Sequence, residues 1–237
     1  MRRHGGSGKV VVFGKDPEPG RVKTRMCPPL SARQAAELYA AMLEDVLVAT
    51  GEFAAQLDLE PILALDPPEA CAAWKGRVPS GYRVIPQRGP ALAERMSRVV
   101  DDEGGGPLPI LLRGSDSPAL PEDRLVSALR ALERCDVTLA PDADGGYSLI
   151  GLRGRWPGLF AHPMSTDRVL AETLRRAEAL GARTALLEAG FDLDRFEDLE
   201  ALQAATSGPG RAICSRTLEY LDREGPWRRA ASARGGL

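Results

Sequence analysis

Short apolar runs alternate along the chain with longer segments in which apolar residues recur every three or four positions. The first run, Lys9–Gly14, is rich in β-branched residues and ends in glycine. Such a run is typical of a strand buried on both faces of a parallel sheet. The same kind of pattern predicts further strands at Leu57–Leu65, Tyr82–Pro86, Leu108–Arg113, Asp136–Ala140, Tyr147–Leu152 and Thr184–Leu187.

Helices are predicted between these strands. The first begins with a capping box at Ser31–Gln34 and repeats Leu38, Met42 and Val46 on one face. Others are expected at Ala91–Val100, Pro121–Glu133, Ser165–Leu180 and Phe196–Ala205, with a further helix over Arg211–Arg223 left open. The alternation predicts a single α/β domain whose central sheet is mostly parallel and flanked by helices. We expect a flexible N-terminus at residues 1–8, the domain at residues 9–206, and a C-terminal helix with a weakly ordered tail at residues 207–237.

Composition narrows the class of protein. The chain has 237 residues, 31 Lys and Arg, 33 Asp and Glu, and a formal net charge of −2, which argues against a general nucleic-acid binder. No apolar run reaches the roughly eighteen residues of a membrane span. The four cysteines are far apart and there are only two histidines, so we expect reduced thiols, a cytoplasmic location and no zinc site. Catalysis would then rest on carboxylates, cationic side chains and a metal.

A basic loop follows the first predicted strand. In open α/β sheets, ligands bind beyond the carboxyl ends of the strands, so residues just after each strand are candidates for a site. Alternation of Arg21, Lys23 and Arg25 would aim three cations the same way if the loop were extended. With Lys15 they would suit the phosphates of a nucleotide, although the Walker A spacing is missing. The alternative is a solvated basic loop.

Two aspartates are candidates for a metal site. Asp116 follows the Leu108–Arg113 strand between a glycine and a proline, which suits a ligand of Mg²⁺ or Mn²⁺, or a residue that shapes a turn or caps a helix. Asp194 could meet Asp116 across the strand ends, where a divalent ion would offset their repulsion. Asp198 lies at the start of the next predicted helix, where an acid complements the helix dipole, so a structural role is favoured.

The remaining motifs are more ambiguous. The double glycine before Tyr147 is typical of a hairpin turn, but it would also let the backbone approach a ligand, with Tyr147 stacking on a sugar or base. The segment Gln87–Gly89 could line a site or form a turn. His162 is expected at the surface.

Five segments together resemble a known family. In chain order they are GKDPEPGRVKTRM, QRGPALAERM, LLRGSDSPALP, LAPDADGGYSLIGL and FDLDRFEDL, and they span about residues 9–205. This order resembles small bacterial GT-A-type nucleotide-diphospho-sugar transferases. The first loop is also similar to that of 2-phospholactate guanylyltransferases, and the aspartate motifs are similar to those of molybdenum-cofactor and sugar nucleotidylyltransferases. The resemblance implies a Rossmann-like GT-A fold.

The resemblance also implies roles for individual residues. The catalytic residues would be Lys23, Arg25 and Asp116, and the metal ligands of Mg²⁺ or Mn²⁺ would be Asp116 and Asp194. The nucleotide and its phosphates are assigned to Gly14, Lys15, Arg21, Lys23, Arg25, Gln87, Gly89 and Ser115. The acceptor or sugar pocket is assigned to Asp144, Gly145, Gly146 and Tyr147. The chain departs from the family pattern at Ser148, Met164 and Arg195–Phe196, so the acceptor pocket is expected to differ from that of relatives.

Three functions follow from these motifs. The first, favoured by the resemblance, is a metal-dependent transfer of a glycosyl group from a nucleoside-diphosphate-sugar to a small-molecule acceptor. The second is a nucleotidylyltransferase that couples an NTP to a phosphorylated small molecule and releases pyrophosphate. The basic loop and the lone Asp116 favour it, because glycosyltransferases more often carry D-x-D after a central strand. The third is a non-catalytic nucleotide-binding protein. We expect a monomer or homodimer with no nucleic-acid or membrane partner.

Overall fold

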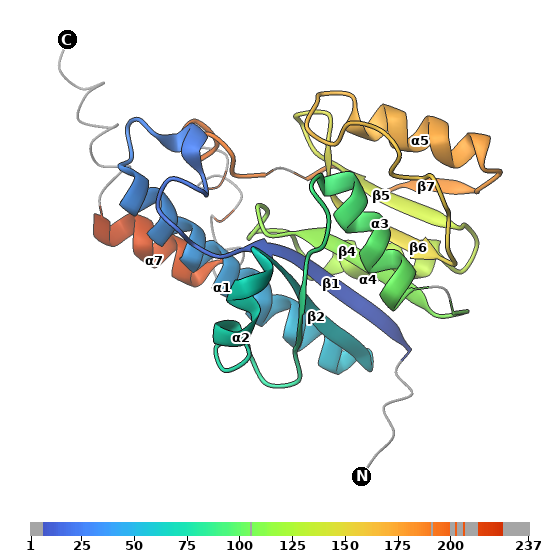
Figure 1. The fold of residues 1–237 in the computed structure, drawn as a ribbon, viewed down its shortest axis with the longest axis horizontal. Helices are drawn as coiled ribbons and strands as arrows, with labels where there is room; N and C mark the ends of the chain where they lie inside the picture. Colours follow the sequence, from blue (N-terminus) through green and yellow to red (C-terminus); the bar gives the residue numbers. More distant parts are fainter. Residues whose placement is uncertain are drawn as a thin grey trace. The chain divides into compact units, whose positions relative to one another are not determined.

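The computed structural model describes residues 7–104, 106–190, 192–199, 202, 206 and 213–224. Within these residues, seven strands form one sheet in the order β3-β2-β1-β4-β6-β5-β7 (Figure 1). Strand β6 runs antiparallel to β4 and β5, and the other neighbouring pairs are parallel. The predicted single α/β domain with a mostly parallel, Rossmann-like sheet is therefore confirmed.

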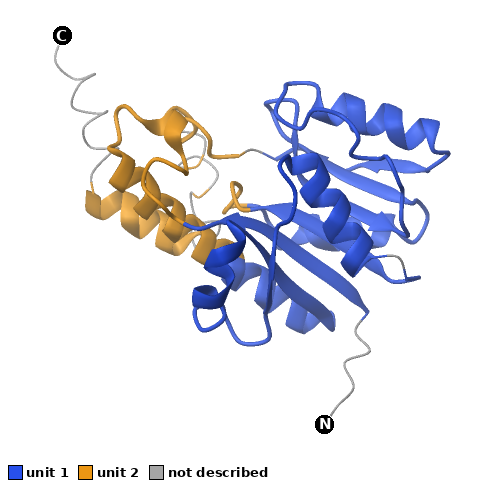
Figure 2. Ribbon diagram, in the orientation of Figure 1, with its two compact units in different colours: residues 1–16, 47–114, 120–191 blue, residues 17–46, 115–119, 192–237 orange. Residues whose placement is uncertain are grey.

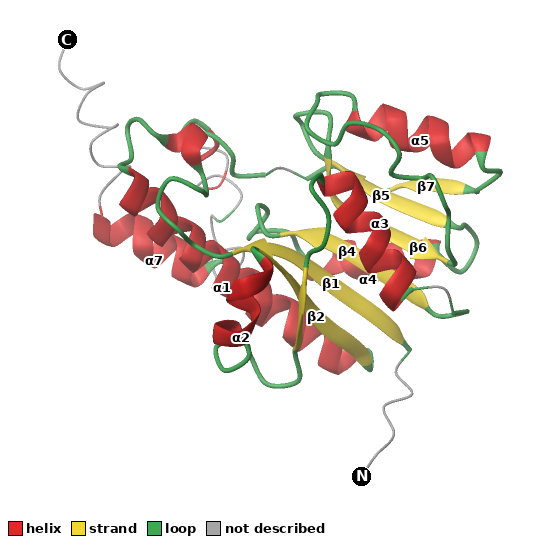
Figure 3. Ribbon diagram, viewed as in Figure 1, coloured by secondary structure: helices red, strands yellow, loops and turns green. Residues whose placement is uncertain are grey.

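The elements follow the apolar pattern closely (Figure 3). The strands are β1 (Gly8–Lys15), β2 (Leu59–Asp66), β3 (Arg83–Pro86), β4 (Pro109–Gly114), β5 (Val137–Pro141), β6 (Tyr147–Arg153) and β7 (Thr184–Leu186). The helices are α1 (Ala32–Gln56), α2 (Cys71–Trp74), α3 (Leu92–Glu103), α4 (Glu122–Ala131), α5 (Val169–Ala179) and α7 (Ser215–Glu224), with short 3-10 turns η1 (Thr24–Met26) and η2 (Pro68–Ala70).

Some boundaries differ from those predicted. Helix α5 begins at Val169 rather than at Ser165, because the preceding residues form a turn in which Thr166 Oγ1 accepts a hydrogen bond from the amide of Arg168 at 3.3 Å. The short helix α2 had no sequence signal. Half of the residues of the predicted helix at Phe196–Ala205, the N-terminus up to residue 6 and the tail from residue 225 lie outside the described residues.

Contacts group the residues of this domain into two compact units (Figure 2). Unit 1 comprises Met1–Asp16, Leu47–Gly114 and Leu120–Phe191, and it contains the whole sheet. Unit 2 comprises Pro17–Val46, Ser115–Ala119 and Asp192–Leu237. Each unit is made of three separate segments of chain, and one of the boundaries between the units falls inside α1.

Unit 1 buries both faces of its sheet. On one face, Val11 and Ile110 belong to a cluster that includes Met96 and Val99 of α3. On the other face, Val10 and Leu111 belong to a cluster with Phe53 of α1 and with residues of α4. Neighbouring residues of β1 and β4 thus point to opposite apolar layers, which explains why these strands appear in the sequence as continuous apolar runs.

Unit 2 is built around the first half of α1. The predicted capping box is present, since the amide of Gln34 donates to Ser31 Oγ at 3.2 Å and the amide of Ser31 donates to Gln34 Oε1 at 3.0 Å. The buried Asp45 carboxylate accepts hydrogen bonds from the amide and hydroxyl of Thr217, each at 2.8 Å. Asp45 therefore caps the N-terminal end of α7 and fixes that helix against α1.

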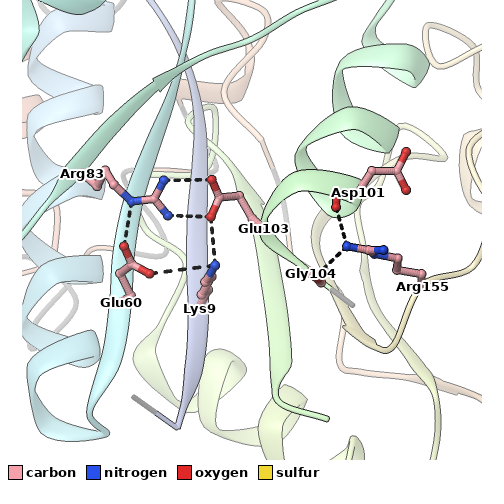
Figure 4. Close-up of polar contacts among 7 residues, drawn as sticks. All are labelled: Lys9, Glu60, Arg83, Asp101, Glu103, Gly104 and Arg155. Carbon is pink, nitrogen blue, oxygen red and sulfur yellow. Dashed lines mark hydrogen bonds and ion pairs between the residues drawn. The ribbon is translucent and has the colours of Figure 1, made fainter. Parts of the chain in front are cut away.

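A network of ion pairs joins the amino-terminal ends of three strands to the end of α3 (Figure 4). Arg83 of β3 donates two hydrogen bonds to Glu103, at 2.8 and 2.5 Å, and a third to Glu60 of β2 at 2.7 Å. Lys9 of β1 donates to Glu103 at 2.9 Å. These bonds, first of all those from Arg83, lower the pKa of Glu103 to about 2. The network lies at the amino-terminal ends of these strands, whereas ligands of open α/β sheets bind beyond the carboxyl ends, so we interpret it as structural.

His162 was expected at the surface, and this is wrong: it is buried, with Nε2 at 3.0 Å from Thr173 Oγ1 and Nδ1 at 3.1 Å from the carbonyl of Pro163. Both ring nitrogens therefore have partners inside the protein. Cys27, Cys71, Cys135 and Cys214 all lie within the described residues, and none of them forms a disulfide bond. None of the helices formed by the described residues is long and apolar enough to cross a membrane.

Candidate functional site

Unit 2 brings together four of the residues predicted to act on phosphates and metal: Lys23, Arg25, Asp116 and Asp194. Lys23 and Arg25 come from the loop after β1, and Asp116 comes from the short segment after β4. Asp194 lies near the start of the third segment of the unit. The backbone joins two of these segments, because the amide of Leu193 donates to the carbonyl of Asp116 at 2.9 Å.

The loop that carries the cations is not extended. Lys23 has a φ of 48° and a ψ of 35°, in the left-handed region, and the 3-10 turn η1 follows it at once. The predicted alternation of Arg21, Lys23 and Arg25 on one side is therefore wrong. The Lys23 side chain is only 2% exposed, whereas those of Arg21 and Arg25 are 56% and 62% exposed.

The buried ammonium group of Lys23 is surrounded by oxygen atoms. It forms an ion pair with Asp116 Oδ1, lies 3.5 Å from Asp194 Oδ1, and donates a hydrogen bond to the carbonyl of Leu193. A buried charge is tolerated when it is both paired and hydrogen-bonded, and Lys23 meets both conditions. No residue type signals the part played by the Leu193 carbonyl, because every residue has a backbone carbonyl.

Asp194 is held from two sides. Its Oδ2 lies 2.6 Å from Arg25 Nη1, while its Oδ1 faces Lys23. Its own amide donates to Asp198 Oδ2 at 2.8 Å, and the amide of Arg195 donates to the same oxygen at 2.6 Å. The interpretation of Asp198 as a structural residue agrees with these bonds, since its carboxylate accepts hydrogen bonds from the backbone amides of Asp194 and Arg195.

The donor set suits a hard divalent cation that is shared with a substrate. The described residues contain no cluster of three or more His, Cys, Asp or Glu able to hold a metal by itself. Asp116 and Asp194 are 46% and 34% exposed, so both carboxylates are accessible to solvent. Mg²⁺ is commonly bound through about one or two carboxylates, with waters and substrate phosphates completing its shell. These residues therefore fit Mg²⁺ or Mn²⁺ brought together with phosphate.

Two other candidates in unit 2 have protein partners. Ser115 is buried, and its hydroxyl lies 2.7 Å from the hydroxyl of Tyr39 on α1. Arg21 forms an ion pair with Glu18 at 2.9 Å within the same loop. Ser115 thus anchors the segment that carries Asp116, and Arg21 remains a solvent-facing cation.

The other nucleotide-binding candidates belong to unit 1. The buried Gln87 side chain donates through Nε2 to the carbonyls of Gly14 and Ala64, both at 2.9 Å, and so fixes the ends of β1 and β2. Gly89 has a φ of 128°, and a Cβ there would lie 2.9 Å from Cβ of Glu94, so this turn requires glycine. Lys15 is exposed at the last position of β1.

The predicted acceptor residues also belong to unit 1 and form the hairpin between β5 and β6. Asp144 Oδ1 accepts a hydrogen bond from the amide of Gly146 at 2.8 Å. Gly145 has a φ of 87°, and a Cβ there would lie 2.1 Å from the carbonyl of Asp167, so the turn passes close to the segment before α5. Tyr147 packs partly buried against the core, and burial raises the pKa of its hydroxyl. Of the two interpretations of this motif, the hairpin is present in the structure, and the contact with an acceptor stays a prediction.

Solved structures define the class of protein. A Desulfovibrio desulfuricans G20 protein, proposed to be a nucleotide-diphospho-sugar transferase, matches with a TM-score of 0.79 and 26% identity over 94% of this chain and 98% of its own. The 4-diphosphocytidyl-2C-methyl-D-erythritol synthase of Anaerococcus prevotii DSM 20548 matches with a TM-score of 0.55 and 8% identity over 85% and 97% of the two chains. CMP:2-keto-3-deoxy-manno-octonic acid synthetase, solved with CTP, matches with a TM-score of 0.51 and 15% identity over 84% and 98%. The fold is therefore that of nucleotide-diphospho-sugar transferases and nucleotidyltransferases, and the resemblance found in the sequence is confirmed.

A family model identifies the chain more closely. Residues 48–166 match the family described as "Uncharacterized protein conserved in bacteria (DUF2064)", and the chain belongs to this family. The matched segment includes Asp116 and the hairpin before Tyr147. A comparison with curated proteins gave no match.

Proposed function

We propose that the protein is a metal-dependent glycosyltransferase that moves a sugar from a nucleoside-diphosphate-sugar to a small-molecule acceptor. The observation that carries the proposal is the cluster in which Lys23 and Arg25 face the carboxylates of Asp116 and Asp194. The 26%-identical relative, itself proposed to be a nucleotide-diphospho-sugar transferase, supports a sugar nucleotide as the donor.

The chemistry follows from the charge that develops during sugar transfer. When the bond from the anomeric carbon to the diphosphate breaks, negative charge grows on the leaving phosphate oxygens. Lys23 and Arg25 would bind these oxygens and stabilise them, because fixed cations near developing charge lower the barrier. Asp116 and Asp194 would hold Mg²⁺ or Mn²⁺, which supplies Lewis-acid stabilisation of the diphosphate when bound. Asp144, Gly145, Gly146 and Tyr147 are retained as the proposed acceptor or sugar pocket.

One observation favours nucleotidyl transfer as a second candidate. Asp116 is the single carboxylate in the segment Gly114–Pro118, where a D-x-D pair would be more usual for a glycosyltransferase. In this reaction a phosphorylated small molecule attacks the α-phosphate of an NTP and pyrophosphate leaves. Catalysis of that kind consists mainly of positioning and charge neutralisation, which Lys23 and Arg25 would also supply.

The test is a thermal-shift panel of NTPs, NDPs and NDP-sugars, each with Mg²⁺, Mn²⁺ or EDTA. A ligand at a hundred times its Kd stabilises the protein by about 2.7 kcal/mol, which shifts the melting temperature measurably. We expect an NDP-sugar with metal to stabilise more than its matching NDP and NTP, and its base and sugar would then define the assay.

Two outcomes would contradict the proposal. Stabilisation by one NTP, with the NDP-sugars inert, would make the protein a nucleotidylyltransferase. Stabilisation by nucleotides that is the same in EDTA, together with no turnover of any candidate donor, would favour a non-catalytic nucleotide-binding protein.

A further inference from the structure

The Lys23 ammonium group lies where two carboxylates would share a cation. Its Nζ contacts Oδ1 of Asp116 and lies 3.5 Å from Oδ1 of Asp194. The Lys23 side chain is almost fully buried, while both carboxylates are partly open to solvent. The protein thus already holds one positive charge between its two candidate metal ligands.

A divalent cation and this ammonium group would compete for the same place. Mg²⁺ binds carboxylate oxygens at about 2.0 to 2.1 Å, so a single ion shared by both aspartates must come close to the atoms that Nζ now contacts. Two like charges at such separations repel strongly, and partial burial weakens the screening by water. Repulsion between the two cations therefore favours a position of Lys23 away from the carboxylates when both bind the metal.

A displaced Lys23 needs another anion. Near its present position the carbonyl of Leu193 is neutral, and Arg25 is itself a cation. A phosphate group of the substrate is an anion that arrives at this site under the function proposed above, and an ammonium group binds phosphate oxygens well. The exchange leaves each charge paired: the metal with Asp116 and Asp194, and Lys23 with phosphate.

We propose that Lys23 couples the binding of the divalent cation to the binding of phosphate. In the protein without substrate, Lys23 takes the cation's place, holds the two carboxylates together and keeps affinity for the free metal low. When a nucleoside diphosphate group enters, Lys23 transfers to its oxygens and the carboxylates become available to the metal that accompanies it. The ligand of this site is then a metal–diphosphate pair rather than the metal alone. The inference rests on the proposed function, because it assumes that Asp116 and Asp194 bind the metal.

The test measures Mn²⁺ binding without any nucleotide, from the electron paramagnetic resonance signal of the free ion. Lys23→Met keeps the length of the side chain but removes its charge, and Lys23→Gln serves as a second variant. We expect both to bind Mn²⁺ about tenfold or more tightly than the parent, since removing a charge that competes for the site favours the metal. Circular dichroism checks that each variant is folded.

Two controls test whether the gain in Mn²⁺ affinity arises at the site of Lys23 and Asp116. Lys75→Met removes a charge from an exposed lysine outside the site and should bind Mn²⁺ as the parent does. Adding Asp116→Asn to Lys23→Met should abolish the gain. Equal or weaker Mn²⁺ binding by the Lys23 variants would overturn the proposal, as would a gain that persists without Asp116. The proposal would also be overturned if the parent protein bound Mn²⁺ tightly without nucleotide and Asp116→Asn abolished that binding.

The same experiment separates this inference from the proposed function. If the Lys23 variants gain no affinity while an NDP-sugar still stabilises the parent only with Mn²⁺, the coupling is wrong and metal-dependent transfer stands. If no variant binds Mn²⁺ and Mn²⁺ does not change the stabilisation by any NDP-sugar, the assignment of the metal site is wrong and both proposals fail.

Discussion

Lys23 and Asp116 form an ion pair although they come from segments that follow two different strands, β1 and β4. The lysine end of the pair is buried and the aspartate end reaches solvent. A ligand from solvent can therefore reach Asp116, whose present partner Lys23 lies on the protein side. We therefore expect substitution of Asp116 to reduce catalysis while leaving the protein folded.

Asp116→Asn should lower metal-dependent turnover by about a hundredfold or more, because an amide is a weak ligand for Mg²⁺ and supplies no charge. The fold should survive, since the amide oxygen still accepts a hydrogen bond from Lys23 and Asp194 keeps its negative charge. The measurement is kcat/KM with Mg²⁺ and with EDTA, alongside the melting temperature. Asp123→Asn, at an exposed position in the first turn of α4, is the matched control. Unchanged turnover in Asp116→Asn would exclude the metal role.

Arg25 should set the salt dependence of nucleotide binding. Its side chain is 62% exposed, so any contact with phosphate is screened by salt, whereas contacts of the buried Lys23 are screened less. Arg25→Ala should bind a nucleoside diphosphate about three- to tenfold more weakly than the parent at low salt, and the difference should shrink at high salt. Isothermal titration calorimetry at several salt concentrations measures both effects.

Arg33→Ala is the control for Arg25→Ala. Arg33 is an exposed arginine on α1, and it pairs with Glu37 at 2.8 Å as Arg25 pairs with Asp194. Its loss should leave the affinity and its salt dependence unchanged. If Arg25→Ala retained the full salt dependence of the parent, the assignment of Arg25 to phosphate would have to be abandoned.

The sequence predicted the sheet well because its central strands, such as β1 and β4, are largely buried on both faces. Val10–Val12 had to be apolar throughout, and such a run differs clearly from the surrounding polar loops. The capping box at Ser31–Gln34 was equally readable, since both of its hydrogen bonds are local in the chain. Features that depend on nearby residues were therefore predictable.

The candidate site was predictable in its residues but not in their arrangement. The left-handed backbone at Lys23 has no signal in the residue type, and this conformation buries Lys23 while its neighbours stay exposed. The burial of His162 depends on Thr173 of α5, and the capping of α7 depends on Asp45. Neither contact lies within a single helix or turn, so the local pattern along the chain does not encode it.

The ion-pair network of Glu103 should contribute to the pH dependence of the free energy of unfolding. Its hydrogen bonds with Arg83 hold the pKa of Glu103 near 2, below the value of an unfolded chain. A carboxyl whose pKa is lowered on folding stabilises the protein above its unfolded pKa, and this stabilisation is lost as the pH falls toward the folded value. Glu103→Gln should therefore reduce the free energy of unfolding by about 1 to 3 kcal/mol at pH 7 and remove part of its decline from about pH 5 to pH 2.

Urea unfolding at a series of pH values checks this prediction. Glu52→Gln, at an exposed position of α1, provides the matched control and should lose little stability at any pH. A Glu103→Gln variant that is as stable as the parent at neutral pH, with the same acid profile, would show that the network in Figure 4 contributes nothing measurable.

The attachment of α7 should depend on Asp45. Its buried carboxylate accepts two hydrogen bonds from Thr217 and a third from the amide of Arg216 at 3.2 Å. Asp45→Ala would leave the two buried donors of Thr217 without this acceptor, so we expect a loss of about 2 to 4 kcal/mol in the free energy of unfolding. Limited proteolysis should then cut next to α7 sooner than in the parent. Glu44→Gln changes the neighbouring exposed acid, which pairs with Arg216 at 3.4 Å, and should cost far less. Equal losses for the two variants would mean that charge near α7, rather than the cap, holds the helix in place.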